Sequence, residues 1–81
     1  MEAVVSAARR SDRVVVPKEW FTAARRAAGL TQDGLARKLD VALGTVSKRE
    51  QGLLKGYQEA WLATLAACGL PASWQPPASP Q

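Results

Sequence analysis

The residues best suited to contact another molecule lie in the stretch from Ala42 to Gln51. Only Val46 has the spacing of an inward-facing residue, so a helix over this stretch contributes little to a core. Its polar and basic side chains are those of Thr45, Ser47, Lys48 and Arg49. Hydroxyl, ammonium and guanidinium groups bind polar partners through hydrogen bonds. The stretch therefore predicts a binding surface.

The sequence holds no constellation that suggests catalysis. It has no histidine, no cluster of metal ligands, no glycine-rich phosphate loop and no nucleophile beside a base. We therefore expect neither an enzyme nor a metal or cofactor site. The single cysteine, Cys68, cannot form an internal disulfide, and the longest apolar runs fall far short of the roughly 20 residues that span a bilayer. These features predict a protein of the reducing cytoplasm without a membrane segment.

Positive charge is concentrated in the first two thirds of the chain. All eleven lysines and arginines lie between Arg9 and Lys55, whereas residues 56–81 carry no base and only Glu59 as an acid. A basic surface of this kind favours polyanions such as nucleic acid, and the alternative is an ordinary solvated surface. Charge alone does not decide between them.

Capping residues and apolar spacing predict four helices, over residues 17–28, 32–39, 42–51 and 57–68. Pro17 suits the first turn of the first helix, Thr31 caps the second, and Gly52 ends the third. The expected inward residues are Phe21, Ala24, Ala28, Leu35, Ala36, Leu39, Val46, Trp61 and Leu65, with Tyr57, Leu62 and Ala66 on one broad apolar face of the last helix. The fold class is thus all-α, a compact bundle of four to five helices, in which residues 1–12 form a short fifth helix or none.

Two terminal segments flank this central domain of residues 17–70. Residues 1–16 form a basic arm that ends in Arg13 to Val16, which is either a short strand or an extended lead-in. Residues 71–81 form a tail whose four prolines forbid a regular helix, with Trp74 available to pack on the domain.

The stretch RRAAGLTQDGLA of residues 25–36, followed by TVSKREQG of residues 45–52, resembles the Cro and phage-repressor class of helix-turn-helix domains. The resemblance spans about residues 17–70 and implies a central helix-turn-helix. It implies that Ala36 lies where the two helices cross and that Val46 anchors the recognition helix. Arg25 and Glu50 match the partly buried ion pair of the family.

The resemblance also implies which residues contact DNA. In this family the first turns of the third helix enter the major groove. The implied base contacts are Ala42, Leu43, Gly44, Ser47 and Lys48, and the implied phosphate contacts are Thr31, Gln32, Thr45, Arg49 and Lys55. For Thr31 and Gln32 the alternative is that they only cap a helix.

Several residues depart from the family pattern. Asp40 replaces the usual turn glycine, Leu43 and Gly44 replace polar residues, and Arg49 stands where an apolar residue is common. Direct base reading is then sparse, which leaves room for shape readout or for the arm to contact a minor groove or the backbone through Arg9, Arg10 and Arg13.

The expected function is a sequence-specific regulator of transcription, a dimeric autorepressor that binds a palindromic operator in double-stranded DNA, as in phages or mobile elements. A homodimer is expected because one recognition helix contacts too few base pairs for useful specificity. No small-molecule effector is expected, since no sensing domain is left over. The alternative is an antitoxin-type module that also binds a partner protein, for which the exposed apolar candidates are Leu53, Leu54, Trp61 and Trp74.

Overall fold

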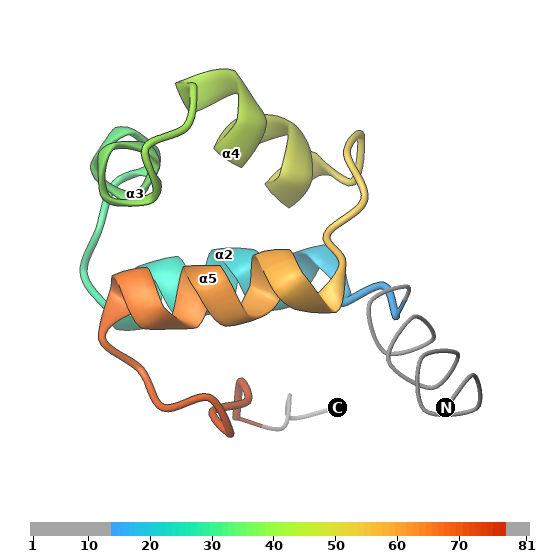
Figure 1. Cartoon of the computed structure of the whole chain (residues 1–81), viewed down its shortest axis with the longest axis vertical. Coiled ribbons are helices and arrows are strands. Elements are labelled where there is room, and N and C mark those ends of the chain that lie inside the picture. The colour runs from blue at the N-terminus through green and yellow to red at the C-terminus, as the bar shows by residue number, and fades with distance from the viewer. Residues whose placement is uncertain (1–13, 78–81) are drawn as a thin grey trace, which may run out of the picture.

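A computed structural model describes residues 14–77, which form four helices and no strand (Figure 1). The helices are α2 (Lys18–Ala27), α3 (Gln32–Leu39), α4 (Leu43–Gln51) and α5 (Gln58–Cys68). This confirms the all-α prediction, with helix ends within one residue of those expected. None of these helices has the length and apolar character needed to cross a membrane. The candidate contacts Arg9, Arg10 and Arg13 lie outside the described residues.

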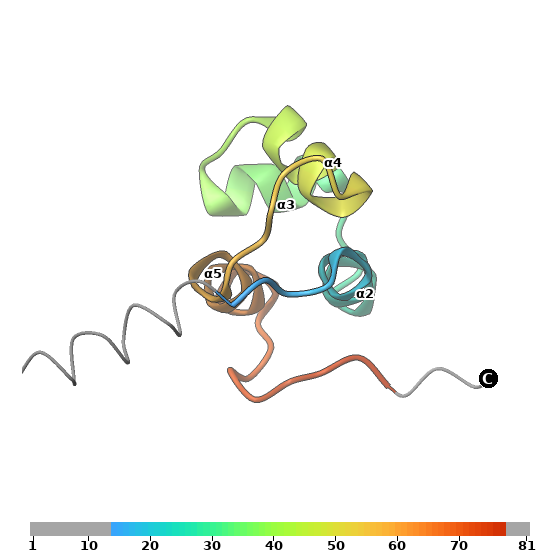
Figure 2. The same cartoon turned by 90° about the vertical axis from the view of Figure 1, so that its right-hand side faces the viewer.

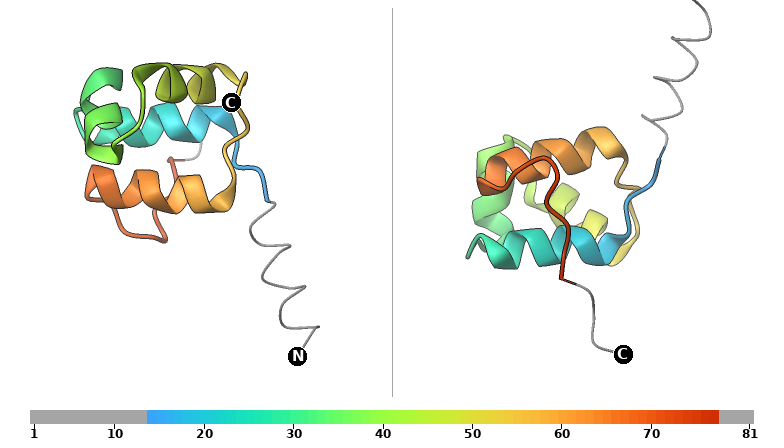
Figure 3. Two further views of the ribbon diagram at one scale, coloured as in Figure 1. Left: turned by 45° about the horizontal axis from the view of Figure 1, so that its top comes forward. Right: turned by 90° about the horizontal axis from the view of Figure 1, so that it is seen from below.

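The helices form two layers. α2 and α5 lie side by side, and α3 and α4 cover one side of this pair (Figures 1 and 2). The segment after α5 passes on the opposite side of the pair and crosses from α5 toward α2 (Figure 3). α4 is therefore part of the outer layer, with one side against the bundle and the other facing away from it.

Two apolar clusters form the core, one within each layer. One lies between α2 and α5 and consists of Val16, Phe21, Ala24, Trp61 and Leu65. The other lies between α3 and α4 and consists of Leu35, Ala36 and Val46, with Leu39 partly buried against it. Trp74 packs on Trp61 with ring centroids 6.0 Å apart, as expected for the tail tryptophan.

α5 differs from the predicted apolar face in one respect. Trp61 and Leu65 are buried as expected for inward residues, so Trp61 is not an exposed residue available to a partner protein. Tyr57, Leu62 and Ala66 lie on the surface of the single chain. The third inward residue is Thr64, whose hydroxyl donates to the carbonyl oxygen of Ala60 at 2.8 Å. A threonine can occupy a core position in a helix because that bond satisfies its hydroxyl group.

The connection between α3 and α4 is a tight turn. Asp40 ends α3 in the left-handed conformation with φ 58°, and its neighbour Val41 donates to the carbonyl oxygen of Ala36 at 3.0 Å. Aspartate adopts this conformation more readily than most residues, which explains how it replaces glycine here. α3 and α4 therefore form the helix-turn-helix expected from the sequence.

Residues 14–16 pack on the bundle although the sequence grouped them with the arm. Val15 forms an isolated antiparallel bridge with Tyr57, in which Val16 donates to the carbonyl oxygen of Gly56 and Gln58 to that of Val14, at 2.7 and 3.0 Å. Val16 itself is buried in the core. Of the two alternatives for this segment, the structure therefore shows an extended lead-in with a single bridge.

Candidate nucleic-acid interface

α4 presents most of its surface to solvent. Val46 is its only buried residue, and residues 43, 44, 47, 48 and 51 occupy positions away from the bundle or at its edge. Leu43 is 47% exposed, and the space around Gly44 is open enough to accept a side chain. The five residues predicted to contact bases, which are Ala42, Leu43, Gly44, Ser47 and Lys48, thus lie together at one exposed surface.

Gln51 belongs to the same surface although it was not among the residues expected to contact bases. Its side-chain amide donates to the hydroxyl oxygen of Ser47 at 2.8 Å. The signal was present in the sequence, because Gln51 follows Ser47 by four residues and Lys48 by three, and such residues are neighbours on a helix. The bond leaves the hydroxyl hydrogen of Ser47 free to be donated to another acceptor.

An ion pair fixes α4 to α2. Arg25 donates from Nε to Glu50 at 2.8 Å and from a terminal nitrogen to the other carboxylate oxygen at 3.1 Å. The two side chains are only 14% and 6% exposed. The second terminal nitrogen of Arg25 donates to the carbonyl oxygen of Leu30, so the guanidinium also holds the link to α3. The ion pair predicted from the sequence is therefore present.

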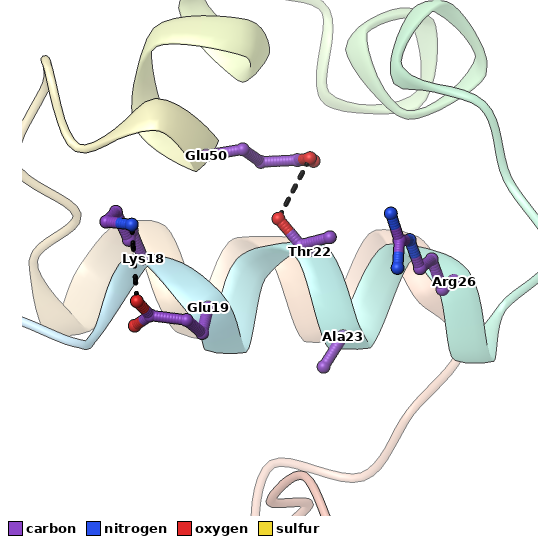
Figure 4. Close-up of a pocket in the computed structure, with 6 residues that line it drawn as sticks. All are labelled: Lys18, Glu19, Thr22, Ala23, Arg26 and Glu50. Carbon is purple, nitrogen blue, oxygen red and sulfur yellow. Dashed lines mark hydrogen bonds and ion pairs between the residues drawn. The ribbon is translucent and has the colours of Figure 1, made fainter.

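Two further donors complete the environment of Glu50. Thr22 donates its hydroxyl at 3.0 Å and Gln32 donates its amide at 3.2 Å. Figure 4 shows Glu50 directed from α4 toward Thr22 on α2, beside a cavity of about 380 Å³ that Arg26 also lines. Burial raises the pKa of Glu50, but the hydrogen bonds from Arg25, Gln32 and Thr22 and the charge of Arg25 outweigh it, so the pKa lies below its ordinary value.

Two of the predicted phosphate contacts, Thr31 and Gln32, lie at the start of α3. The Thr31 hydroxyl oxygen accepts a hydrogen bond from the backbone N–H of Gly34 at 3.0 Å, which confirms Thr31 as the cap. The side-chain amide of Gln32 donates to Glu50. The feature of Gln32 that favours a phosphate is therefore its position at the positive end of the helix dipole. A phosphate contact by these two residues stays a prediction.

The other three predicted phosphate contacts lie in different surroundings. Thr45 is half-buried in the first turn of α4, and Lys55 is exposed in the loop that follows Gly52. Arg49 follows Val46 by three residues and turns inward, with its guanidinium carbon 5.6 Å from the centroid of the Phe21 ring. The structure thus does not bring Arg49 together with Lys48, because the apolar stem and guanidinium plane of Arg49 pack on the bundle side of α4.

No family model matches this chain, and no curated protein or solved structure is significantly similar to it. Within residues 14–77, no three histidine, cysteine, aspartate or glutamate side chains gather where they would hold a metal ion. The arrangement on α4 offers hydroxyl, amide and ammonium donors beside the apolar groups of Ala42 and Leu43. Such a surface suits an extended partner with acceptor groups, methyl groups and negative charge.

Proposed function

We propose that the chain is a sequence-specific DNA-binding regulator of the helix-turn-helix type, resembling the Cro and phage-repressor class. The observation that carries this proposal is the outer surface of α4, a helix with one buried residue whose remaining side chains, apart from that of Leu43, are polar, charged or small. A helix that adds so little to the core has most of its surface available to contact another molecule. The buried bonds of Glu50 hold this helix at a fixed position on α2.

The exposed side chains of α4 have separate roles in the proposed complex. Lys48 donates to O6 and N7 of a guanine in the major groove. Leu43 and Ala42 contact thymine methyl groups, and Ser47 donates its hydroxyl to a base acceptor. Contacts to phosphates by Thr31, Gln32, Thr45 and Lys55 set the register of the helix on the duplex. Arg49 is not part of this set, because its guanidinium lies over the Phe21 ring.

The proposed active form is a homodimer on a palindromic operator. A single α4 reads too few base pairs, and dimers of such domains read half-sites about one helical turn apart. α5 offers a surface for pairing, because Leu62 and Ala66 are exposed on it and its only charged residue is Glu59. Binding of its own operator in the cytoplasm would make the chain an autorepressor that responds to its own concentration.

Lys48→Ala should weaken binding to a preferred duplex by about tenfold and binding to a random duplex by no more than about twofold. The reason is that a base contact adds to preferred binding only, whereas a phosphate contact adds to both. Fluorescence anisotropy with labelled duplexes at low salt measures the two affinities.

The matched control for this experiment is Lys38→Ala, which removes an exposed lysine from α3. It should leave the ratio of preferred to random affinity unchanged. Equal losses on both duplexes in Lys48→Ala would remove Lys48 from the base contacts. No binding of any duplex at low salt would reject the DNA proposal.

A further inference from the structure

The loop of residues 52–57 is flanked by two cavities of about 350 and 280 Å³. Both are lined by Arg49, Leu54 and Lys55. The first also reaches Tyr57 and the second reaches Val15. We call the two cavities together the Arg49 groove. Its residues come from the bundle side of α4, the loop, the extended lead-in and the first turns of α2 and α5. It is separate from the outer surface of α4 and shares only Lys55 with the proposed DNA contacts.

Arg49 is an incompletely bonded cation in this groove. Its Nε is buried and has no hydrogen-bond partner, and no carboxylate among residues 14–77 forms an ion pair with it. Burial lowers the pKa of Arg49. Glu59 lines the same groove at the first turn of α5 but is exposed and unpaired among these residues. A buried charged donor without an acceptor is costly, so the site favours an anionic ligand.

The walls of the groove are apolar and exposed. Val15 is 50% exposed, and Leu54 and Tyr57 are each 39% exposed. Leu53, next to the groove, is 72% exposed. A DNA phosphate would use the cations and leave these side chains in water, whereas a peptide with carboxylate and apolar side chains would use both.

The described part of the lead-in also has a backbone edge without a main-chain partner among residues 14–77. Val14 and Val16 use their carbonyl and N–H groups on the loop, whereas the N–H and carbonyl groups of Val15 have no backbone partner among the described residues. Val15 and Tyr57 are a non-hydrogen-bonded pair of the antiparallel bridge, so these groups of Val15 point away from Tyr57. An extended segment can add to such an edge through main-chain hydrogen bonds.

We propose that the Arg49 groove binds an acidic, extended segment of a partner protein, with its carboxylates on Arg49 and Lys55 and its apolar side chains against Val15, Leu54 and Tyr57. The net positive charge of the chain disfavours a second copy at this place. The proposal does not depend on DNA binding by α4.

Selection from a random library of 12-residue peptides on the immobilised full chain tests this proposal. Enriched peptides should combine aspartate or glutamate with valine, leucine or isoleucine. A labelled peptide from the enriched pool should bind Arg49→Met about tenfold more weakly and Leu54→Ser about fivefold more weakly than the unchanged chain. Methionine keeps an apolar stem over Phe21, and Leu54 is exposed, so both variants should fold.

Two matched controls separate the groove from general charge attraction. Arg26→Met removes an exposed arginine from α2, and Leu62→Ser removes an exposed leucine from α5. Both should bind the peptide within about twofold of the unchanged chain. The proposal is overturned if acidic residues are not enriched, if Arg26→Met loses as much as Arg49→Met, or if Leu54→Ser loses nothing. Displacement of the peptide by a random duplex, with an equal loss of duplex binding in Arg49→Met, would assign the groove to DNA and also overturn it.

Discussion

Glu50→Ala should lower the free energy of unfolding by about 3 to 5 kcal/mol, a large part of the stability of a domain this small. Glu50 accepts hydrogen bonds from Arg25, Thr22 and Gln32, and its side chain is 6% exposed. Without it the guanidinium of Arg25 stays partly buried with no opposite charge. Urea unfolding followed by tryptophan fluorescence measures the change.

Asp33→Ala is the matched control for the loss of a carboxylate. Asp33 pairs with Arg37 at 3.0 Å on the surface of α3, where both side chains are more than half exposed, so its loss should cost at most about 0.5 kcal/mol. The double variant Arg25→Met with Glu50→Leu should recover much of the stability lost in Glu50→Ala, because no unpaired charge remains. Equal effects of Glu50→Ala and Asp33→Ala would contradict the structural role of the ion pair.

The same carboxylate links stability to pH. Its pKa in the folded chain lies below the ordinary value of 4.5, so its contribution is fully present above that pH and is lost as the pH falls through the lower folded value. Stability of the unchanged chain should therefore fall more steeply below about pH 4.5 than that of the double variant. If the stability of the unchanged chain and that of the double variant depend on acid pH in the same way, a group other than Glu50 causes the loss of stability.

Affinity for duplex DNA should fall by roughly tenfold or more between 50 and 200 mM salt. Lys55 is the one cation among the four proposed phosphate contacts, so a dimer neutralises about two phosphates, and each neutralised phosphate releases condensed counterions. Anisotropy titrations over this salt range give the slope of log affinity against log salt concentration. Lys55→Ala should make this slope shallower by about one for each protomer.

Lys38→Ala again serves as the control, since it removes the same charge from a position outside the proposed contacts. Its slope should match that of the unchanged chain. A slope near zero would mean that phosphates contribute little, and a slope equally reduced by both variants would mean that only overall charge matters.

Local features of the fold were predictable because they depend on a few neighbouring residues. Thr31 marks the start of α3, and Gly52 marks the end of α4. The three-residue spacing of Phe21 and Ala24 marks the inner face of α2. The ion pair of Arg25 with Glu50 was predicted only through the resemblance, since nothing local relates two residues 25 positions apart.

Features set by distant contacts were not predictable. Val16 was grouped with the arm, but its backbone N–H donates to the carbonyl oxygen of Gly56 and its side chain is buried in the core. Leu62 has the same side-chain chemistry as Leu65, yet only Leu65 faces α2, and the rotation of α5 that decides this follows from the packing of Trp61 between Phe21, Trp20 and Trp74. The inward position of Arg49 had one signal, because the family pattern commonly has an apolar residue there, but arginine is normally a surface residue.

Selection of bound sequences from a random pool of duplexes tests directly whether the outer surface of α4 reads DNA. The enriched duplexes should share a palindrome whose half-sites lie about one helical turn apart, and Lys48→Ala should relax the preference at one position in each half-site. If no common sequence is enriched, or if Lys48→Ala enriches the same sequence as the unchanged chain with the same preference at every position, α4 does not read DNA in the proposed way.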